Sequence, residues 1–201
     1  RLGANSLLSA MYSGTVAGPA AVNYIKGLQG TSEEGAKKAG ELELKKQQEY
    51  NDKICKMDGK ENPYSLHDEM GELMRLNVGI VRNNKALAET DVKLQEFQER
   101  WHNCNIVDHG SYSNQTVLFV RQLWNMMQLA RVITLGALRR DESRGSHYKP
   151  EFPNRDDENF LKTTIADYTP EGPKFSWEEV DISLVKPVER KYNVDSREVK
   201  K

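Results

Sequence analysis

The sequence predicts a mainly α-helical protein: a first helix, then a three- to four-helix bundle, then a small C-terminal extended segment with a β-hairpin. Three observations support this fold class. Apolar residues recur at helical spacing from residue 63 to 104, and residues 114–138 are apolar on most sides of a helix. After Arg140 the helical period disappears, and two short strand-like stretches flank the turn sequence TPEGP.

The composition excludes several classes of function. The 201 residues carry a net charge of −1, so we expect no nucleic-acid partner. No apolar run reaches the ~18 residues of a membrane-spanning helix. Cys55 and Cys104 lie far apart, and the four histidines lack metal-ligand spacing, so we expect reduced thiols and no metal site. The first residue is Arg1 and no signal-like segment follows, which predicts that the chain begins inside a longer protein.

The first two predicted helices differ in character. Residues 5–27 combine apolar and small residues, which would let this helix lie close to another backbone, and Pro19 is expected to bend or divide it. The sequence GLQGTSEEG that follows is typical of a linker. Residues 33–57 are rich in Lys and Glu with few apolar anchors, so this helix is predicted to be largely solvated.

Three further helices are predicted between residues 62 and 138. Asn62 followed by Pro63 is typical of a helix cap with proline at the first helical position. Two helices then carry apolar stripes: Leu66, Met70, Leu73, Met74 and Val81 in the first, and Leu87, Leu94, Phe97, Trp101 and Cys104 in the second. Ser113 is expected to cap the fifth helix, residues 114–138. That helix is apolar on most sides and is therefore predicted to be the central, buried one.

A densely charged stretch, RRDESRGSHYKPEFPNRDDENFLKTT, occupies residues 139–164 directly behind the fifth helix. Its charges alternate in sign. A solvated loop is the usual interpretation of such a composition. Alternatively, Pro150 and Pro153 hold a loop whose arginines and carboxylates pair with fixed partners against another surface. The residues alone leave both interpretations open.

The opening residues, RLGANSLL, place an arginine and an Asn-Ser pair at a helix start. Free backbone N–H groups and the positive end of the helix dipole suit an anionic or polar ligand there, and Arg1 suits a carboxylate. An ordinary helix cap is the alternative. No nucleophile–base pair, metal cluster or glycine-rich phosphate loop can be assembled from the sequence. Composition and spacing therefore indicate a helical module that docks on a partner.

Two separated motifs resemble a known family. RLGANSLLSAMYSGTVAG resembles the closing flavin-binding segment of succinate dehydrogenase/fumarate reductase flavoprotein subunits, and the charged stretch 139–164 resembles the C-terminal signature of the same family. The Lys-rich middle and the sequence VDISLVKP are most similar to the Bacillus-type members. Two departures stand out: Phe160 replaces a common tryptophan, and Lys149 replaces a frequent arginine, which weakens any bidentate contact.

The resemblance implies roles for four residues near the start of the chain. Arg1 matches the arginine that grips a substrate carboxylate, and its planar fork suits a dicarboxylic acid. Asn5, Ser6 and Leu7 match the segment that contacts the isoalloxazine of FAD at a helix N-terminus. No catalytic residue and no metal ligand is implied within the chain.

The resemblance also implies a role for the charged stretch. Glu142, Ser143, Arg144, Gly145 and His147 match the loop that folds back onto the flavin domain. We expect Glu142, Arg144 and His147 to orient this loop as a domain latch, without a proton-transfer role.

The implied domain order is the tail end of an FAD-binding domain at residues 1–30, the helical bundle at 31–140, and the latch, hairpin and charged tail at 141–201. The whole protein would interconvert succinate and fumarate with FAD and pass electrons to an iron–sulfur subunit. It would lie peripherally at the cytoplasmic face of a bacterial membrane, meeting the membrane anchor subunit only indirectly.

The resemblance further places the dinucleotide-binding fold and the acid/base residues in flavin and substrate domains upstream of Arg1. The chain alone is therefore expected to be inactive and to hold FAD weakly. An L-aspartate oxidase-like flavoprotein and a non-catalytic helical docking module are the alternatives.

Overall fold

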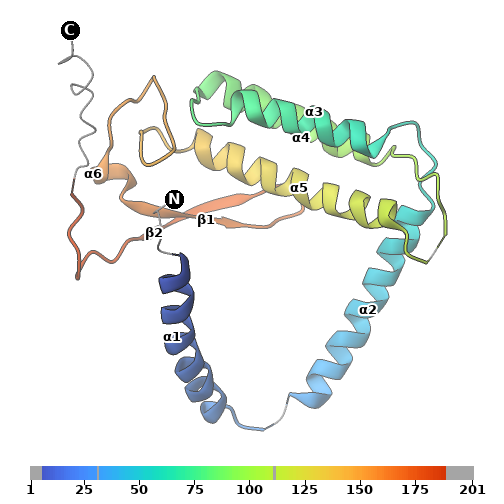
Figure 1. Ribbon diagram of the computed structural model, residues 1–201, viewed down its shortest axis with the longest axis horizontal. Helices are drawn as coiled ribbons and strands as arrows, with labels where there is room; N and C mark the ends of the chain where they lie inside the picture. Colours follow the sequence, from blue (N-terminus) through green and yellow to red (C-terminus); the bar gives the residue numbers. More distant parts are fainter. Residues whose placement is uncertain (1–5, 31, 111, 189–201) are drawn as a thin grey trace. The chain divides into compact units, whose positions relative to one another are not determined.

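The computed structural model describes residues 6–30, 32–110 and 112–188. Its contacts divide the chain into two compact units, residues 1–50 and 51–201, and each is described by itself. The domain boundaries expected at residues 30 and 140 stay predictions. The described part is mainly helical with one small antiparallel sheet, which confirms the predicted fold class (Figure 1).

The first unit contains helix α1, Ser6–Gly27, and most of helix α2, Glu33–Cys55. Pro19 lies inside α1 without ending it. No described residue of α1 is buried, and its apolar side chains are largely exposed. Most of α2 is exposed as well, as its Lys- and Glu-rich composition predicts.

Capping by asparagine starts each of the three helices that follow. Helix α3, Pro63–Asn77, begins as predicted: the Asn62 side chain accepts a hydrogen bond from the Tyr64 amide at 2.9 Å, and proline fills the first position. Helix α4, Asn84–Trp101, is capped by Asn83. Helix α5, Gln115–Leu138, is capped by Asn114, so the predicted cap at the preceding residue, Ser113, is wrong.

The amide side chain explains why Asn114 takes this position. Its oxygen accepts a hydrogen bond from the Val117 amide at 3.0 Å, while its nitrogen donates to the Gly110 carbonyl at 3.0 Å. A serine hydroxyl cannot accept from the helix and also supply the two donors that an amide has. Asn114 therefore fastens the preceding loop to the start of α5.

The core lies where α4 packs against both α3 and α5 (Figure 1). Trp101 of α4 is almost fully buried, donates its indole N–H to the Val120 carbonyl at 2.8 Å, and packs on Trp124 of α5. The predicted stripes supply Leu66, Met70, Leu87, Leu94, Phe97 and Cys104 to this core, and Leu123 and Met127 of α5 are buried with them. Val81, the last member of the first stripe, is instead exposed.

Helix α5 is central, since it contacts α3, α4 and the first strand, but it is not buried on most sides as its composition predicted. Leu129 and Ile133 are 61% and 51% exposed. They lie four residues apart and therefore share one face of the helix. No described element covers that face completely.

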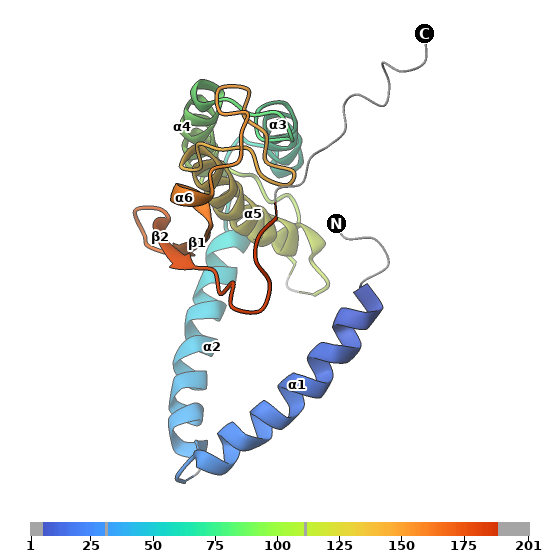
Figure 2. The same cartoon turned by 90° about the vertical axis from the view of Figure 1, so that its left-hand side faces the viewer.

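A hairpin completes the second unit. Strands β1, Lys162–Asp167, and β2, Lys174–Glu179, pair antiparallel with Thr164 opposite Trp177, which confirms the predicted hairpin. Strand β2 ends at Glu179, opposite Lys162, the first residue of β1. The one-turn helix α6, Asp157–Phe160, leads into β1, and β1 contacts α5 (Figure 2).

Candidate functional site

The residues predicted to meet the substrate and the flavin lie at the start of the chain. Arg1 and Asn5 lie outside the described residues. Ser6 and Leu7 are the first two residues of α1, and the Leu7 side chain is 80% exposed. The first turn of α1 contains no acidic residue, so no negative side chain within that turn neutralises the positive end of the helix dipole.

Glu142 is the centre of the charged segment. Its carboxylate is fully buried and accepts hydrogen bonds from Arg140 at 2.6 Å, from Arg144 at 2.9 and 3.0 Å, and from the Asp156 amide at 2.9 Å. Burial acts to raise the pKa of Glu142, but the bonds from Arg144, the Asp156 amide and Arg140 outweigh it and hold this pKa below its ordinary value. Glu142 is therefore a structural anion, satisfied by its own neighbours.

The arginines around Glu142 extend the network to the hairpin and to α6. Arg140 also donates to the carbonyls of Phe160 at 2.8 Å and Lys162 at 2.7 Å, and its guanidinium lies over the ring of Trp177. Arg144 reaches the Asp157 carboxylate at 2.6 Å. These contacts join the end of α5 to both elements that follow it.

His147 joins the network to the turn between α3 and α4. Its Nε2 lies 2.9 Å from the Arg140 carbonyl, and its Nδ1 lies 2.8 Å from Nη1 of Arg82. A carbonyl only accepts and a guanidinium only donates, so the ring carries its proton on Nε2 and is neutral. Burial lowers the pKa of His147, and the positive charges of Arg82, Lys149 and Arg140 lower it further, against the opposing effect of the Arg140 carbonyl.

Lys149 is fully buried, although the sequence marked it only as a departure from an arginine. Its ammonium donates to the Leu138 carbonyl at 3.1 Å and to Asp141 at 2.9 Å. Asp141 also accepts from the Asn84 side chain at 3.0 Å. Lys149 therefore donates a hydrogen bond to a carbonyl at the end of α5, and Asp141 links it to the Asn84 side chain at the start of α4.

These contacts decide between the two interpretations of the charged stretch. The solvated loop is wrong, because Glu142 and Lys149 are fully buried. The fixed Arg–carboxylate network is confirmed, and its described partners belong to the same unit. Sequence reasoning missed Arg82 and Asn84, because their partners lie about sixty residues further along the chain. The role of Glu142, Arg144 and His147 as a latch to another domain stays a prediction.

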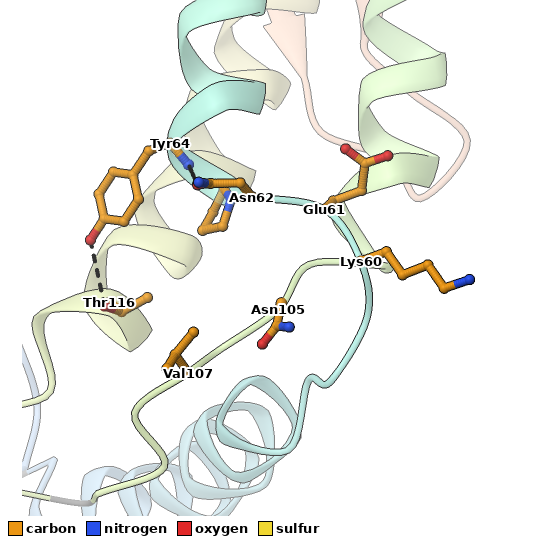
Figure 3. A pocket seen from close by; sticks show the side chains of 8 residues that line it. Lys60, Glu61, Asn62, Tyr64, Asn105, Val107 and Thr116 are labelled. Carbon is orange, nitrogen blue, oxygen red and sulfur yellow. Dashed lines mark hydrogen bonds between the residues drawn. The ribbon is translucent and has the colours of Figure 1, made fainter.

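A hollow of about 300 Å³ lies beside the start of α3 (Figure 3). Most of its polar groups already have partners: Asn62 caps α3, Glu61 pairs with Arg100 at 2.9 Å, and the Tyr64 hydroxyl lies 3.5 Å from that of Thr116. The Lys60 side chain points away from the hollow (Figure 3). This arrangement offers a ligand little free polar chemistry.

The described residues contain neither a metal-ligand cluster nor a membrane-spanning helix. In that part of the chain, no three His, Cys, Asp or Glu side chains gather in a way that could hold a metal ion. No described helix is both long and apolar enough to span a membrane.

A family model described as the C-terminal part of fumarate reductase flavoproteins matches residues 67–192, which include the bundle, the charged network and the hairpin. The chain belongs to this family.

The relatives of this flavoprotein chain are subunits of two related enzymes. It is 51% identical over 195 residues to the succinate dehydrogenase flavoprotein subunit of Bacillus subtilis, covering 96% of this chain and 33% of the relative. It is 30% identical to the fumarate reductase flavoprotein subunit of Haemophilus influenzae, covering 98% and 32%. The flavoprotein chain therefore spans about a third of the length of the curated relatives it matches.

Solved structures show the same fold for this flavoprotein region. A chain of Escherichia coli quinol fumarate reductase superposes with a TM-score of 0.69 at 30% identity, covering 81% of this chain and 27% of that one. A succinate dehydrogenase of Mycobacterium smegmatis, at 23% identity, superposes with a TM-score of 0.59 over 79% of this chain and 26% of that one, which shows the fold alone.

Proposed function

We propose that this chain is the C-terminal part of a flavoprotein subunit that oxidises succinate to fumarate, or catalyses the reverse reaction, and passes electrons to an iron–sulfur subunit. The observation that carries the proposal is the 51% identity to a succinate dehydrogenase flavoprotein over 96% of the chain. Identity to the fumarate reductase flavoproteins of Haemophilus influenzae and Escherichia coli is 30% and 32%. The chain is therefore more similar to the succinate dehydrogenase flavoprotein than to these two fumarate reductase flavoproteins.

The start of the chain would serve the substrate and FAD. The exposed Ser6 and Leu7, at an α1 terminus without acidic residues, fit a flavin whose reduced form carries negative charge. When bound, FAD supplies the hydride acceptor for the succinate C–H bond. Arg1 would hold one substrate carboxylate through two parallel hydrogen bonds, and Asn5 would contact the flavin beside Ser6.

The charged network would act as the domain latch. Its buried carboxylate and neutral imidazole fix the backbone of residues 140–157, so the loop can present one constant surface to an upstream flavin domain. Glu142, Arg144 and His147 would orient this surface and transfer no proton. The protein would lie peripherally at the cytoplasmic face of the membrane, with the anchor subunit reached through the iron–sulfur subunit. The isolated chain would be inactive.

The Arg1→Lys substitution in the full-length flavoprotein tests the substrate assignment. Lysine keeps the charge but loses the bidentate fork, so succinate-dependent reduction of an artificial acceptor is expected to fall on the order of 100-fold. Arg75→Lys, at an exposed arginine paired with Glu72, is the matched control and should keep full activity. Normal turnover in Arg1→Lys would contradict the assignment, and turnover with L-aspartate instead of succinate would identify an oxidase of that class.

A further inference from the structure

Most described arginines have a carboxylate partner, whereas Arg82 has none among the described residues. Six have an Asp or Glu within ion-pair distance: Arg75, Arg100, Arg131, Arg140, Arg144 and Arg155. Arg82 is partly buried in the turn between α3 and α4, and none of the described carboxylates pairs with it. A partly desolvated cation without a counter-charge is costly, so its surroundings favour an anion.

The neighbours of Arg82 fix its position without neutralising it. Its Nε donates to the carbonyls of Val78 at 3.1 Å and Gly79 at 2.7 Å, and its Nη1 donates to the neutral His147 at 2.8 Å. The second terminal nitrogen, Nη2, has no hydrogen-bond partner among the described residues. Of the carboxylates of this region, Glu142 pairs with Arg140, Asp141 pairs with Lys149, and Glu151 accepts a hydrogen bond from the Asn84 amide.

Arg82 and His147 line one side of a hollow with a volume of about 270 Å³, whose other walls come from α5 and the hairpin. Its apolar lining includes Ile133 and Gly136 of α5, Ala166 of β1 and Phe175 of β2. Ile133 is 51% exposed. The hollow therefore combines an apolar floor with one uncompensated, rigidly held guanidinium.

We infer that this hollow receives an acidic side chain with apolar neighbours, contributed by the part of the same flavoprotein that lies outside these 201 residues, and that its carboxylate pairs with Arg82. The inference rests on the proposed function. The occupant follows from charge complementarity and from length: the chain spans about a third of its relatives, so most of the protein that could cover this face lies elsewhere. A hollow of this volume can receive one or two side chains of a docked polypeptide segment.

Site-specific photo-crosslinking in the full-length flavoprotein tests the inference. Ala166 is exposed and lines the hollow, so Ala166→p-benzoylphenylalanine places the crosslinker at its edge. Mass spectrometry is expected to find a crosslink within the same chain, to a peptide outside the 201 residues that contains Asp or Glu. Adding Arg82→Gln should lower the crosslink yield about tenfold, because the charge pair is lost.

Two further variants keep the result interpretable. Arg139→Gln is the matched control: Arg139 is exposed, also lacks a carboxylate partner among the described residues, and lies over Phe175, and its loss should leave the yield unchanged. Arg82→Gln also removes hydrogen bonds within the turn and could disturb it. Ile133→Asp avoids this problem, because it adds a competing carboxylate at a half-exposed position and should lower the yield equally.

The remaining outcomes overturn either the Arg82 pairing or the proposed function. An unchanged yield in both Arg82→Gln and Ile133→Asp overturns the inference, as does a crosslink to another subunit, to a second copy, or to a peptide without an acidic residue. The readout does not depend on turnover. A protein that crosslinks as expected but does not oxidise succinate refutes the proposed function alone, whereas an active protein that crosslinks identically in both variants refutes the Arg82 pairing alone.

Discussion

The charged segment 139–164 and helix α1 differ in opposite ways from what their composition suggests. The charged segment looks like a solvent-exposed loop, yet Glu142 and Lys149 are fully buried. Helix α1 has the apolar composition of a buried helix, yet none of its described residues is buried and Leu7 is 80% exposed. The charged segment finds its partners among the described residues of its own unit, whereas no described residue of α1 is buried.

The two regions differ in how many of their groups have partners among the described residues. Each charge at the centre of the network has a counter-charge or carbonyl within hydrogen-bond distance, so this region can be stable by itself. The uncovered apolar residues of α1 exceed the scattered exposure that is normal on a protein surface, which indicates an interaction site. Under the proposed function, that partner is the upstream flavin domain.

The strongest test of this contrast is Glu142→Gln. Removing the charge leaves Arg140 and Arg144 facing a neutral amide in a buried site, so the free energy of unfolding is expected to fall by about 3 kcal/mol in urea denaturation. The full-length protein should also become more sensitive to limited proteolysis if the network is the latch. Glu72→Gln, at an exposed carboxylate paired with Arg75, should leave both measurements unchanged. Equal urea midpoints for Glu142→Gln and the parent protein would show that the network adds no stability.

The pH dependence of stability tests the His147 link. Its pKa in the folded state is lowered from 6.5, so the unfolded chain binds more protons as the pH falls below 6.5. The stability that His147 contributes is therefore complete above pH 6.5 and is lost as the pH falls through the lower folded pKa. Urea denaturation between pH 7.5 and 5.5 should show this loss, and His147→Gln should remove it.

The stability that Glu142 contributes depends on pH in a more acidic range than that of His147. Burial acts to raise the pKa of Glu142, but its arginine and amide hydrogen bonds hold this pKa below 4.5. The stability that Glu142 contributes to the fold is therefore lost only as the pH falls below 4.5. If the parent protein and His147→Gln lose stability in parallel between pH 7.5 and 5.5, a group other than His147 titrates there.

The smallest effect on stability is expected in α1. Leu7→Ser and Met11→Ser remove exposed apolar side chains, so the free energy of unfolding of the 201-residue chain should change by less than about 0.5 kcal/mol. In the full-length flavoprotein the same changes should reduce the ratio of bound FAD to protein, because this face would then be buried. Leu94→Ala, at a fully buried position, is the contrasting control and should cost about 3 kcal/mol in the chain alone. An unaltered FAD ratio would mean that α1 does not pack on the flavin domain.

The sequence by itself determined the features that depend on neighbouring residues. Asn62 and Pro63 start α3 because a cap needs only a side-chain oxygen and a residue whose missing N–H costs nothing. The Leu94, Phe97 and Trp101 stripe fixed the buried face of α4. The hairpin around TPEGP followed from local turn chemistry. Each of these can be predicted from a pattern of residues a few positions apart in the sequence.

The candidate site was only partly visible in the sequence. Glu142, Arg144 and His147 were found through a resemblance of motif, and the alternation of charge suggested pairing. Their actual partners include Arg82, which is 65 residues from His147, and no local pattern specifies such a contact. The first residues of the flavin segment, Arg1 and Asn5, stay predictions.

Only the tertiary structure decided which surfaces are covered. The apolar composition of α5 fixed its helical form, but the packing of α3, α4 and β1 decided that Leu123 is buried and that Leu129 and Ile133 are not. In the same way, the charge of Lys149 predicts exposure, and burial became possible only because Leu138 and Asp141 meet it in space. Local rules act through short-range sterics and hydrogen bonds, whereas burial depends on which distant segments the fold brings together.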